Sequence, residues 1–167
     1  MELRPEQQFQ QKVRESLDCL TPQLVPVLTA LVQHKYPPEV AAIDFEIFSD
    51  AFCSQFPVRA FFLDSNNTEF FLFVDGQATY PSPIDPGLLE IDCVYPQLLE
   101  DDLSEASPEC DPWHLATLEL LRGFQSCWDK SGGRGFHLAA TIAHHDSSEE
   151  LNLLTGEVQC RGSSFGA

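Results

Sequence analysis

The densest group of side chains able to bind a metal or transfer a proton lies near the end of the sequence. It consists of His144, His145, Asp146, Glu149 and Glu150. Imidazole and carboxylate groups are ligands for zinc, manganese and iron. Neighbouring residues of a strand point to opposite faces, so both histidines can ligate one ion only where the chain turns. We therefore predict a solvated hairpin turn here, with neither a metal nor another cofactor.

Other sequence patterns that could support catalysis or phosphate binding lack the flanking elements or partner residues that this chemistry needs. The glycine-rich run 132–135 follows a predicted helix and precedes a strand, whereas a phosphate-binding loop needs the opposite order. No GxSxG elbow is present, and from the sequence alone no cysteine can be assigned a histidine and an orienting acid. His114 follows Trp113 in the first turn of a predicted helix, which is typical of a surface residue. The sequence therefore favours a protein that is not an enzyme.

The six cysteines are spread along the chain. They are Cys19, Cys53, Cys93, Cys110, Cys127 and Cys160. There is no CxxC pair, and this spacing matches neither a compact disulfide framework nor a structural zinc site. We expect them to be small, mostly buried apolar residues.

Negative charge is concentrated in the middle of the chain. The formal net charge is −17, and residues 36–121 contain 17 acidic residues and a single base, Arg59. A field of one sign repels nucleic acid and anionic membranes, because phosphate binding needs lysine and arginine. The same field attracts a cationic partner and accelerates its association. Charge segregation thus favours a protein-binding function.

The region 90–111 is the predicted partner-binding surface. Apolar residues interleave with its acids, as in an interface whose charged rim steers the partner and whose apolar centre is desolvated. The candidate contact residues are Glu90, Asp92, Leu98, Leu99, Glu100, Asp101, Asp102, Leu103, Glu105, Glu109 and Asp111.

Helical periodicity predicts four helical segments. Apolar residues at spacings of three and four from Phe9 to Leu20 indicate a first helix, and Thr21-Pro22 indicates the start of a second that ends near His34. A short helix followed by an exposed loop is expected within 97–111. Asp111-Pro112 is a strong start signal for a longer helix that ends at Gly132-Gly133.

Alternation and apolar runs predict the strands. Residues 43–47 alternate as in a half-exposed strand, while 58–63 and 70–74 are apolar on both faces, as in central strands of an antiparallel meander. Residues 88–94 form a further predicted strand with Glu90 and Asp92 on one face. A C-terminal hairpin of 136–142 and a return strand from Leu151 completes the sheet.

These elements indicate one α+β domain over residues 1–167. We expect an antiparallel sheet of about five to six strands, packed against N-terminal helices and one central helix, with residues 160–167 forming a frayed tail. No apolar run approaches the roughly 20 residues that cross a bilayer, and the N-terminus lacks the apolar core of a secretory signal. The predicted location is cytoplasmic.

The central acidic block and the strand–turn–strand segment 136–157, which ends in Thr-Gly-Glu, resemble bacterial cognate immunity proteins against secreted antibacterial toxins, including those of type VI secretion systems. The resemblance implies an inhibitor that forms a one-to-one complex, as a monomer, with a basic toxin that acts in the cytosol. A nuclease is the expected target, since its cationic groove normally binds phosphate. No diagnostic motif is shared, so the resemblance assigns no residue roles.

Two alternatives remain open. Type III secretion chaperones are also small, acidic α+β proteins with a similar order of elements, but they dimerise and end in a helix. A small metal-dependent enzyme built around 144–150 is the third possibility.

Overall fold

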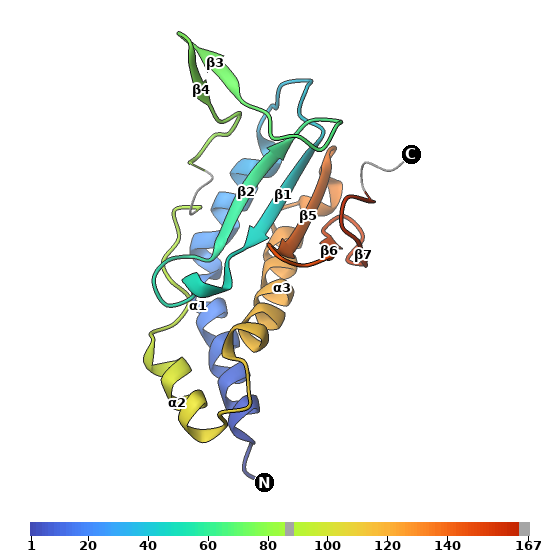
Figure 1. Ribbon diagram of the computed structural model, residues 1–167. Helices are drawn as coiled ribbons and strands as arrows, with labels where there is room; N and C mark the ends of the chain where they lie inside the picture. The colour runs from blue at the N-terminus through green and yellow to red at the C-terminus, as the bar shows by residue number, and fades with distance from the viewer. Residues whose placement is uncertain (86–88, 164–167) are drawn as a thin grey trace.

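The computed structural model describes residues 1–85 and 89–163, which form an α+β structure (Figure 1). Three α-helices, a five-stranded mixed sheet and a separate hairpin are present in this part of the chain. The α+β class is therefore confirmed, whereas the prediction of a purely antiparallel sheet is wrong.

Helix α1 (Pro5–Gln33) is one continuous helix, where the sequence predicted two. Pro22 and Pro26 are exposed, and they lie four residues apart on the outer side of the helix. Each proline removes one helical hydrogen bond, at a cost of about 3 kcal/mol. On the inner side, an unbroken apolar stripe from Phe9 to Leu31 is buried, at about 1.5–3 kcal/mol for each large side chain. Burial of this stripe offsets the cost of both prolines and keeps the helix continuous.

The main sheet has the strand order β2-β1-β5-β6-β7. Its strands are β1 (Ala42–Ile47), β2 (Val58–Leu63), β5 (Ala139–His144), β6 (Glu149–Asn152) and β7 (Val158–Cys160). Strands β1 and β5 are parallel, with Ala42 opposite Ala139, and the other pairs are antiparallel. A parallel pair needs a long crossover, and α3 (Pro112–Lys130) lies on the chain between them.

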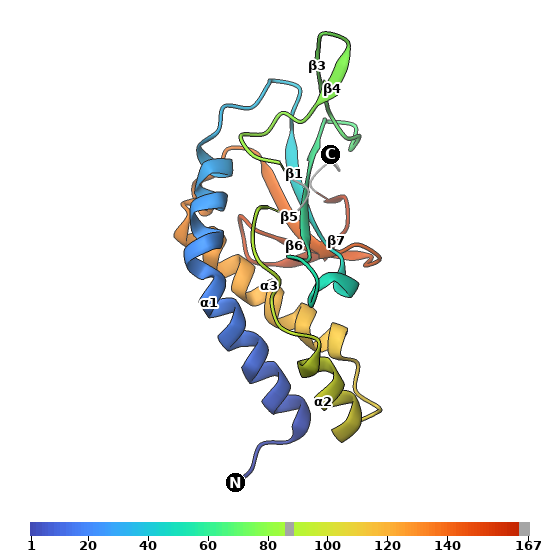
Figure 2. The same ribbon diagram turned by 90° about the vertical axis from the view of Figure 1, so that its left-hand side faces the viewer.

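Helices α1 and α3 pack side by side against one face of this sheet (Figures 1 and 2). The ring of Phe45 on β1 lies 4.9 Å from that of Phe124 and 5.8 Å from that of Trp128, measured between centroids. The opposite face carries the polar residues of β1, Asp44 and Glu46. The core thus lies between the helices and this face of the sheet.

The strand predictions misjudged which strands are central. Strand β2, predicted to be central, lies at the sheet edge, whereas β1, predicted to be half-exposed, lies between β2 and β5 and is almost wholly buried. Alternation identified the polar face of β1 correctly. It could not show that distant residues cover that face.

Residues 70–74 do not form a central strand. Only β3 (Leu72–Val74) is extended, and it pairs with β4 (Gln77–Thr79) in a hairpin that projects from the main sheet (Figure 1). Asp75 and Gly76 both have positive φ, which suits a tight two-residue hairpin turn. The turn pairs β3 with β4, the segment that immediately follows it in the chain. Phe73 is therefore 74% exposed.

The predicted strand 88–94 is also absent from its described residues, 89–94; Leu88 lies outside the described part of the chain. Leu89 and Glu90 have φ values of 52° and 56°, which belong to a turn and not to a strand. Glu90 and Asp92 therefore share no strand face. They lie on the connection that descends to α2 (Leu98–Ala106) (Figure 2).

The prediction for α3 is confirmed at both ends. The Asp111 carboxylate accepts hydrogen bonds from the backbone N–H groups of Trp113 and His114, and Gly132 ends the helix in the left-handed conformation. Strand β5 begins at Ala139, three residues later than predicted. A 3-10 turn, η2 (Gly133–Gly135), occupies the preceding segment.

The expected frayed tail is wrong for residues 160–163. Cys160 belongs to β7, and the Arg161 side chain is held by several partners described below. Residues 164–167 lie outside the described part of the chain.

The cysteines are less buried than predicted. Cys127 is buried, Cys53 and Cys110 are half-buried, and Cys19, Cys93 and Cys160 are exposed. All six are free thiols. No helix in the described ranges is long and apolar enough to cross a membrane.

Candidate functional site

The structure divides the predicted partner-binding residues into exposed and buried groups. Eight are exposed: Glu90, Asp92, Leu98, Asp101, Asp102, Glu105, Glu109 and Asp111. Leu99 is half-buried. Glu100 and Leu103, 9% and 3% exposed, point inward from α2 and cannot form part of a contact surface. The period of the helix explains the correction, because these two residues lie on the apolar face of α2.

Glu100 organises the interior beside α2. Its Oε1 atom accepts hydrogen bonds from the Tyr95 hydroxyl at 3.0 Å, the Trp113 indole N–H at 3.2 Å and the Cys53 thiol at 3.1 Å. Burial, followed by the hydrogen bond to Glu100, raises the pKa of Cys53 to about 12. Glu100 is thus an acceptor for buried donors and fixes the edge of the Trp113 ring.

The exposed acids of α2 and the following loop are available to a partner. Asp101, Asp102, Glu105 and Glu109 form no ion pair with any described residue. Leu98, 65% exposed, provides an apolar group on the same helix. These residues keep the combination of charge and apolar surface that the sequence predicted.

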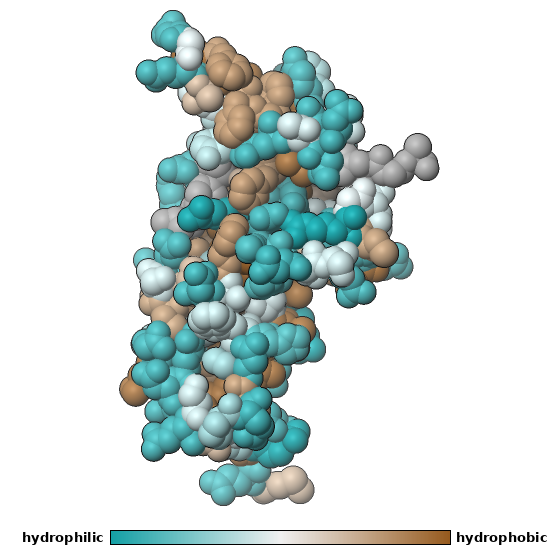
Figure 3. Space-filling view, viewed as in Figure 1, coloured by the Kyte–Doolittle hydropathy of each residue, from teal (hydrophilic) through white to brown (hydrophobic). Residues whose placement is uncertain are grey.

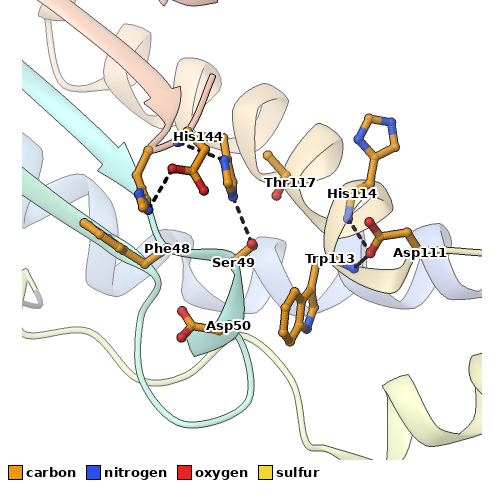
Figure 4. Close-up of a pocket in the computed structure, with 10 residues that line it drawn as sticks. Phe48, Ser49, Asp50, Asp111, Trp113, His114, Thr117 and His144 are labelled. Carbon is orange, nitrogen blue, oxygen red and sulfur yellow. Dashed lines mark hydrogen bonds and ion pairs between the residues drawn. The ribbon is translucent and has the colours of Figure 1, made fainter. Parts of the chain in front are cut away.

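A cleft of about 630 Å³ lies next to this acidic segment (Figure 4). Its walls are the short helix η1 (Ser49–Ala51), the first two turns of α3, and the turn between β5 and β6. Three carboxylates line it, those of Asp50, Asp111 and Asp146, and its lining contains neither lysine nor arginine. We call it the η1–α3 cleft. Asp111 joins it to the acidic loop that follows α2.

Histidines from two elements also line the η1–α3 cleft. The backbone N–H of Asp146 donates to His144 Nδ1 at 3.2 Å, so a neutral His144 carries its proton on Nε2. That Nε2 lies 3.0 Å from Ser49 Oγ. Nε2–H therefore donates to the serine hydroxyl and cannot remove its proton, which is the reverse of the arrangement in a nucleophilic serine site. His145 stacks on Phe48 with ring centroids 5.0 Å apart.

The predicted turn at 144–149 is confirmed, since β5 ends at His144 and β6 begins at Glu149. No group of three or more His, Cys, Asp or Glu side chains in the described ranges is arranged to hold a metal ion. His114 is exposed, as predicted, and lines the η1–α3 cleft.

A second cleft, of about 550 Å³, lies on the open face of the sheet; we call it the sheet-face cleft. The Arg161 guanidinium spans it and donates to Asp44 Oδ2 at 3.2 Å, to Glu46 Oε1 and to the carbonyl of His145 at 3.0 Å. Glu150, 5% exposed, lines the same cleft. Acids thus outnumber the single arginine. Figure 3 shows hydrophilic side chains over most of this side of the molecule and apolar ones around the hairpin.

Asp44 has the most informative titration in the sheet-face cleft. Burial raises its pKa to about 6, although the Thr141 hydroxyl, which donates at 2.9 Å, and Arg161 both favour the ionised form. Burial also raises the pKa of Glu69, with a contribution from the nearby charge of Glu46. The charges of Asp44 and Glu69 are therefore incompletely compensated.

Sequence reasoning missed most residues of both clefts. Ser49 and Asp50 are far from Thr117 in the chain, and nothing local marks these residues as neighbours of the 144–146 turn. Asp44 and Glu46 did carry a signal, because their alternation within β1 placed them on the polar face.

Comparison of the chain with protein families, with curated proteins and with solved structures finds no match. Function must therefore be inferred from the surface of the molecule itself.

Proposed function

We propose that this protein is an immunity-type inhibitor that binds and neutralises a basic toxin acting in the cytosol, with a nuclease as the expected target. The observation that carries the proposal is the row of exposed carboxylates on α2 and the loop after it, which have no ion-pair partner among the described residues. Asp101, Asp102, Glu105 and Glu109 belong to this row, and Asp111 extends it to the η1–α3 cleft.

Unpaired carboxylates suit a partner whose surface carries lysine and arginine. A nuclease has such a surface, because it must bind phosphate. An acidic protein docked there competes with the nucleic acid by charge and by shape. Complementary fields of this kind raise association rates by about 10- to 1,000-fold at low salt.

Exposed apolar groups beside the acids supply the centre of the interface. Leu98 is 65% exposed and Trp113 is 43% exposed. Tryptophan is enriched among the residues that dominate binding energies, and surrounding charges steer the partner while contributing less to affinity. The surface therefore offers both the steering and the desolvated contact that a tight inhibitor needs.

The experiment measures binding of the basic protein that co-purifies with this chain from its native cells. Stopped-flow association at increasing salt is compared for three proteins. The test variant is Asp101→Lys, Asp102→Lys and Glu105→Lys combined. The control variant, Glu2→Lys, Glu39→Lys and Glu157→Lys combined, has the same net charge at exposed sites elsewhere.

We expect a one-to-one complex whose association rate falls as salt rises. The test variant should associate at least about 10-fold more slowly than the control variant, because local charge steers the encounter. Inhibition of the partner's nuclease activity should fall in parallel. Salt-independent association, or equal rates for the two variants, would show that this surface does not steer the partner. An obligate dimer in light scattering would favour the secretion-chaperone alternative.

A further inference from the structure

The η1–α3 cleft contains a buried hydroxyl without a partner. Thr117 is 8% exposed, and its Oγ1 atom has no hydrogen-bond partner in the described part of the chain. Figure 4 shows this side chain on the cleft side of α3, in the space between His144 and Trp113. Buried polar groups are nearly always hydrogen-bonded, and an unpaired one is destabilising. The oxygen itself is shielded from solvent, so a group bound in the cleft would reach it after rotation of the side chain.

Two carboxylates of the cleft also have unused acceptor capacity. Asp50 on η1 has no hydrogen bond or ion pair with any described residue. Asp111 uses Oδ1 for both of its bonds to the start of α3, at 2.9 and 3.3 Å, and leaves Oδ2 free. The cleft therefore presents acceptors on both of its walls, η1 and α3.

Trp113 adds a fixed aromatic face. Its indole N–H donates to buried Glu100 at 3.2 Å, which holds the edge of the ring in place, while the residue is 43% exposed and lines the cleft. The face of an indole is the preferred aromatic surface for a cation.

The charge of the lining selects the sign of the ligand. Three carboxylates face the cleft without a lysine or arginine. The start of α3, where backbone N–H groups bind anions in other proteins, is already occupied by the Asp111 carboxylate. Three histidines also line the cleft, and His144 Nε2–H is already bonded to Ser49. An anionic group would meet repulsion from the three carboxylates, whereas a cation meets acceptors on both walls.

We propose that the η1–α3 cleft receives one arginine side chain of the basic partner, an inference that rests on the function proposed above. A guanidinium presents up to five N–H donors in one plane and can stack on an aromatic ring at the same time. It would stack on Trp113 and donate to Asp50, to Asp111 and to the Thr117 hydroxyl. A lysine ammonium, a compact point charge, would engage fewer of these groups at once.

The cleft can be tested without the partner. N-acetyl-L-arginine amide is titrated into the full chain and followed by backbone amide NMR shifts, with N-acetyl-L-citrulline amide as the neutral analogue of the same shape. We expect saturable, millimolar binding of the arginine compound, with shifts at Ser49, Asp50 and Thr117, and none for the citrulline compound. One side chain offers too few contacts for tighter binding.

Variants show which groups act. Asp50→Asn removes the charge at an exposed position and should weaken binding of the arginine amide about 10-fold. Thr117→Val keeps the side-chain shape and should weaken it about 3-fold, through loss of the hydroxyl. The matched control, Glu39→Gln, removes an exposed charge elsewhere and should leave binding unchanged. Circular dichroism verifies that each variant is folded.

Equal binding of the two compounds, or no saturable shift at about 100 mM, overturns the proposal, because a built site should exceed such weak contact. Wild-type affinity for the partner in a folded Asp50→Asn, Thr117→Val double variant also overturns it, while leaving the proposed function intact. If the arginine amide binds but no basic protein co-purifies with the chain, the cleft is supported as an arginine site and the proposed function is overturned instead.

Discussion

Replacement of Asp44 by asparagine should make the protein more stable at neutral pH and leave it unchanged in acid. Asparagine has the shape of a protonated aspartate, so the variant mimics the form of Asp44 that burial favours. In the folded protein the pKa of Asp44 is raised from its ordinary 3.8 to about 6. Folding therefore favours the protonated carboxyl.

The sign and the magnitude of this stability change follow from proton linkage. Between about pH 4 and pH 6 the folded state binds more protons than the unfolded state, so stability from this group falls as pH rises. It is fully present below pH 3.8 and is lost as pH passes through 6. A shift of about two pKa units corresponds to about 2–3 kcal/mol. The shift already includes the attraction of Arg161, so loss of that ion pair requires no further correction.

Urea unfolding at several pH values from 3.5 to 8, roughly the span over which both pKa values are crossed, provides the assay. The quantity measured is the free energy of unfolding of Asp44→Asn minus that of the wild type. It should be near zero at the acid end and rise to about 2–3 kcal/mol above pH 6. Other titrating groups, Glu69 among them, cancel in the difference.

The matched control is Glu39→Gln, which removes an exposed acid and should give a flat difference. A flat profile for Asp44→Asn, or one in which the wild type becomes the more stable protein above pH 6, would refute the reasoning. Either result would mean that Arg161 and Thr141 compensate the buried charge in full.

Three further substitutions test the interior. Glu100→Ala should lower the free energy of unfolding by about 3 kcal/mol in thermal or urea unfolding, since it leaves the buried Tyr95 hydroxyl and the partly buried Trp113 indole N–H without an acceptor, and Glu100→Gln should lower it less. Gly133→Ala should lower it by about 2–3 kcal/mol, because the added Cβ would lie 2.2 Å from the Trp128 indole nitrogen; Gly135→Ala, with open space around it, is the control. Thr117→Val should raise it by about 1 kcal/mol in the free protein, and an unchanged value would show that water satisfies the hydroxyl.

The elements that were predicted well are those with strong local signals. Asp111-Pro112 and Gly132 delimit α3 because a cap and a left-handed residue act within one helical turn. The α+β class and the turn after His144 followed from periodicity in the same way.

The errors share one cause, which is that distant partners decide local outcomes. The proline residues of α1 look like a helix boundary until the buried stripe beneath them is known. The apolar run ending at Val74 looks central, yet its turn pairs it with its own neighbour. The acidic residues of α2 and the loop after it, which form one half of the candidate site, could be predicted from the sequence. The other half, the η1–α3 cleft, depends on contacts between segments up to 97 residues apart, such as Phe48 with His145.

The parallel pairing of β1 with β5 also constrains the order in which the molecule can fold. Contacts across the pair, such as Thr141 with Asp44, join residues 97 positions apart. Closing a loop of that length costs about 4 kcal/mol of chain entropy before the contact contributes anything. During synthesis, β1 cannot pair with β5 until β5 has been made. Phe45 on β1 likewise cannot pack until its aromatic partners on α3 have been made. The amino-terminal half therefore emerges as an acidic chain with an unfinished core, and its repulsive charge keeps that exposed apolar surface from associating with other copies.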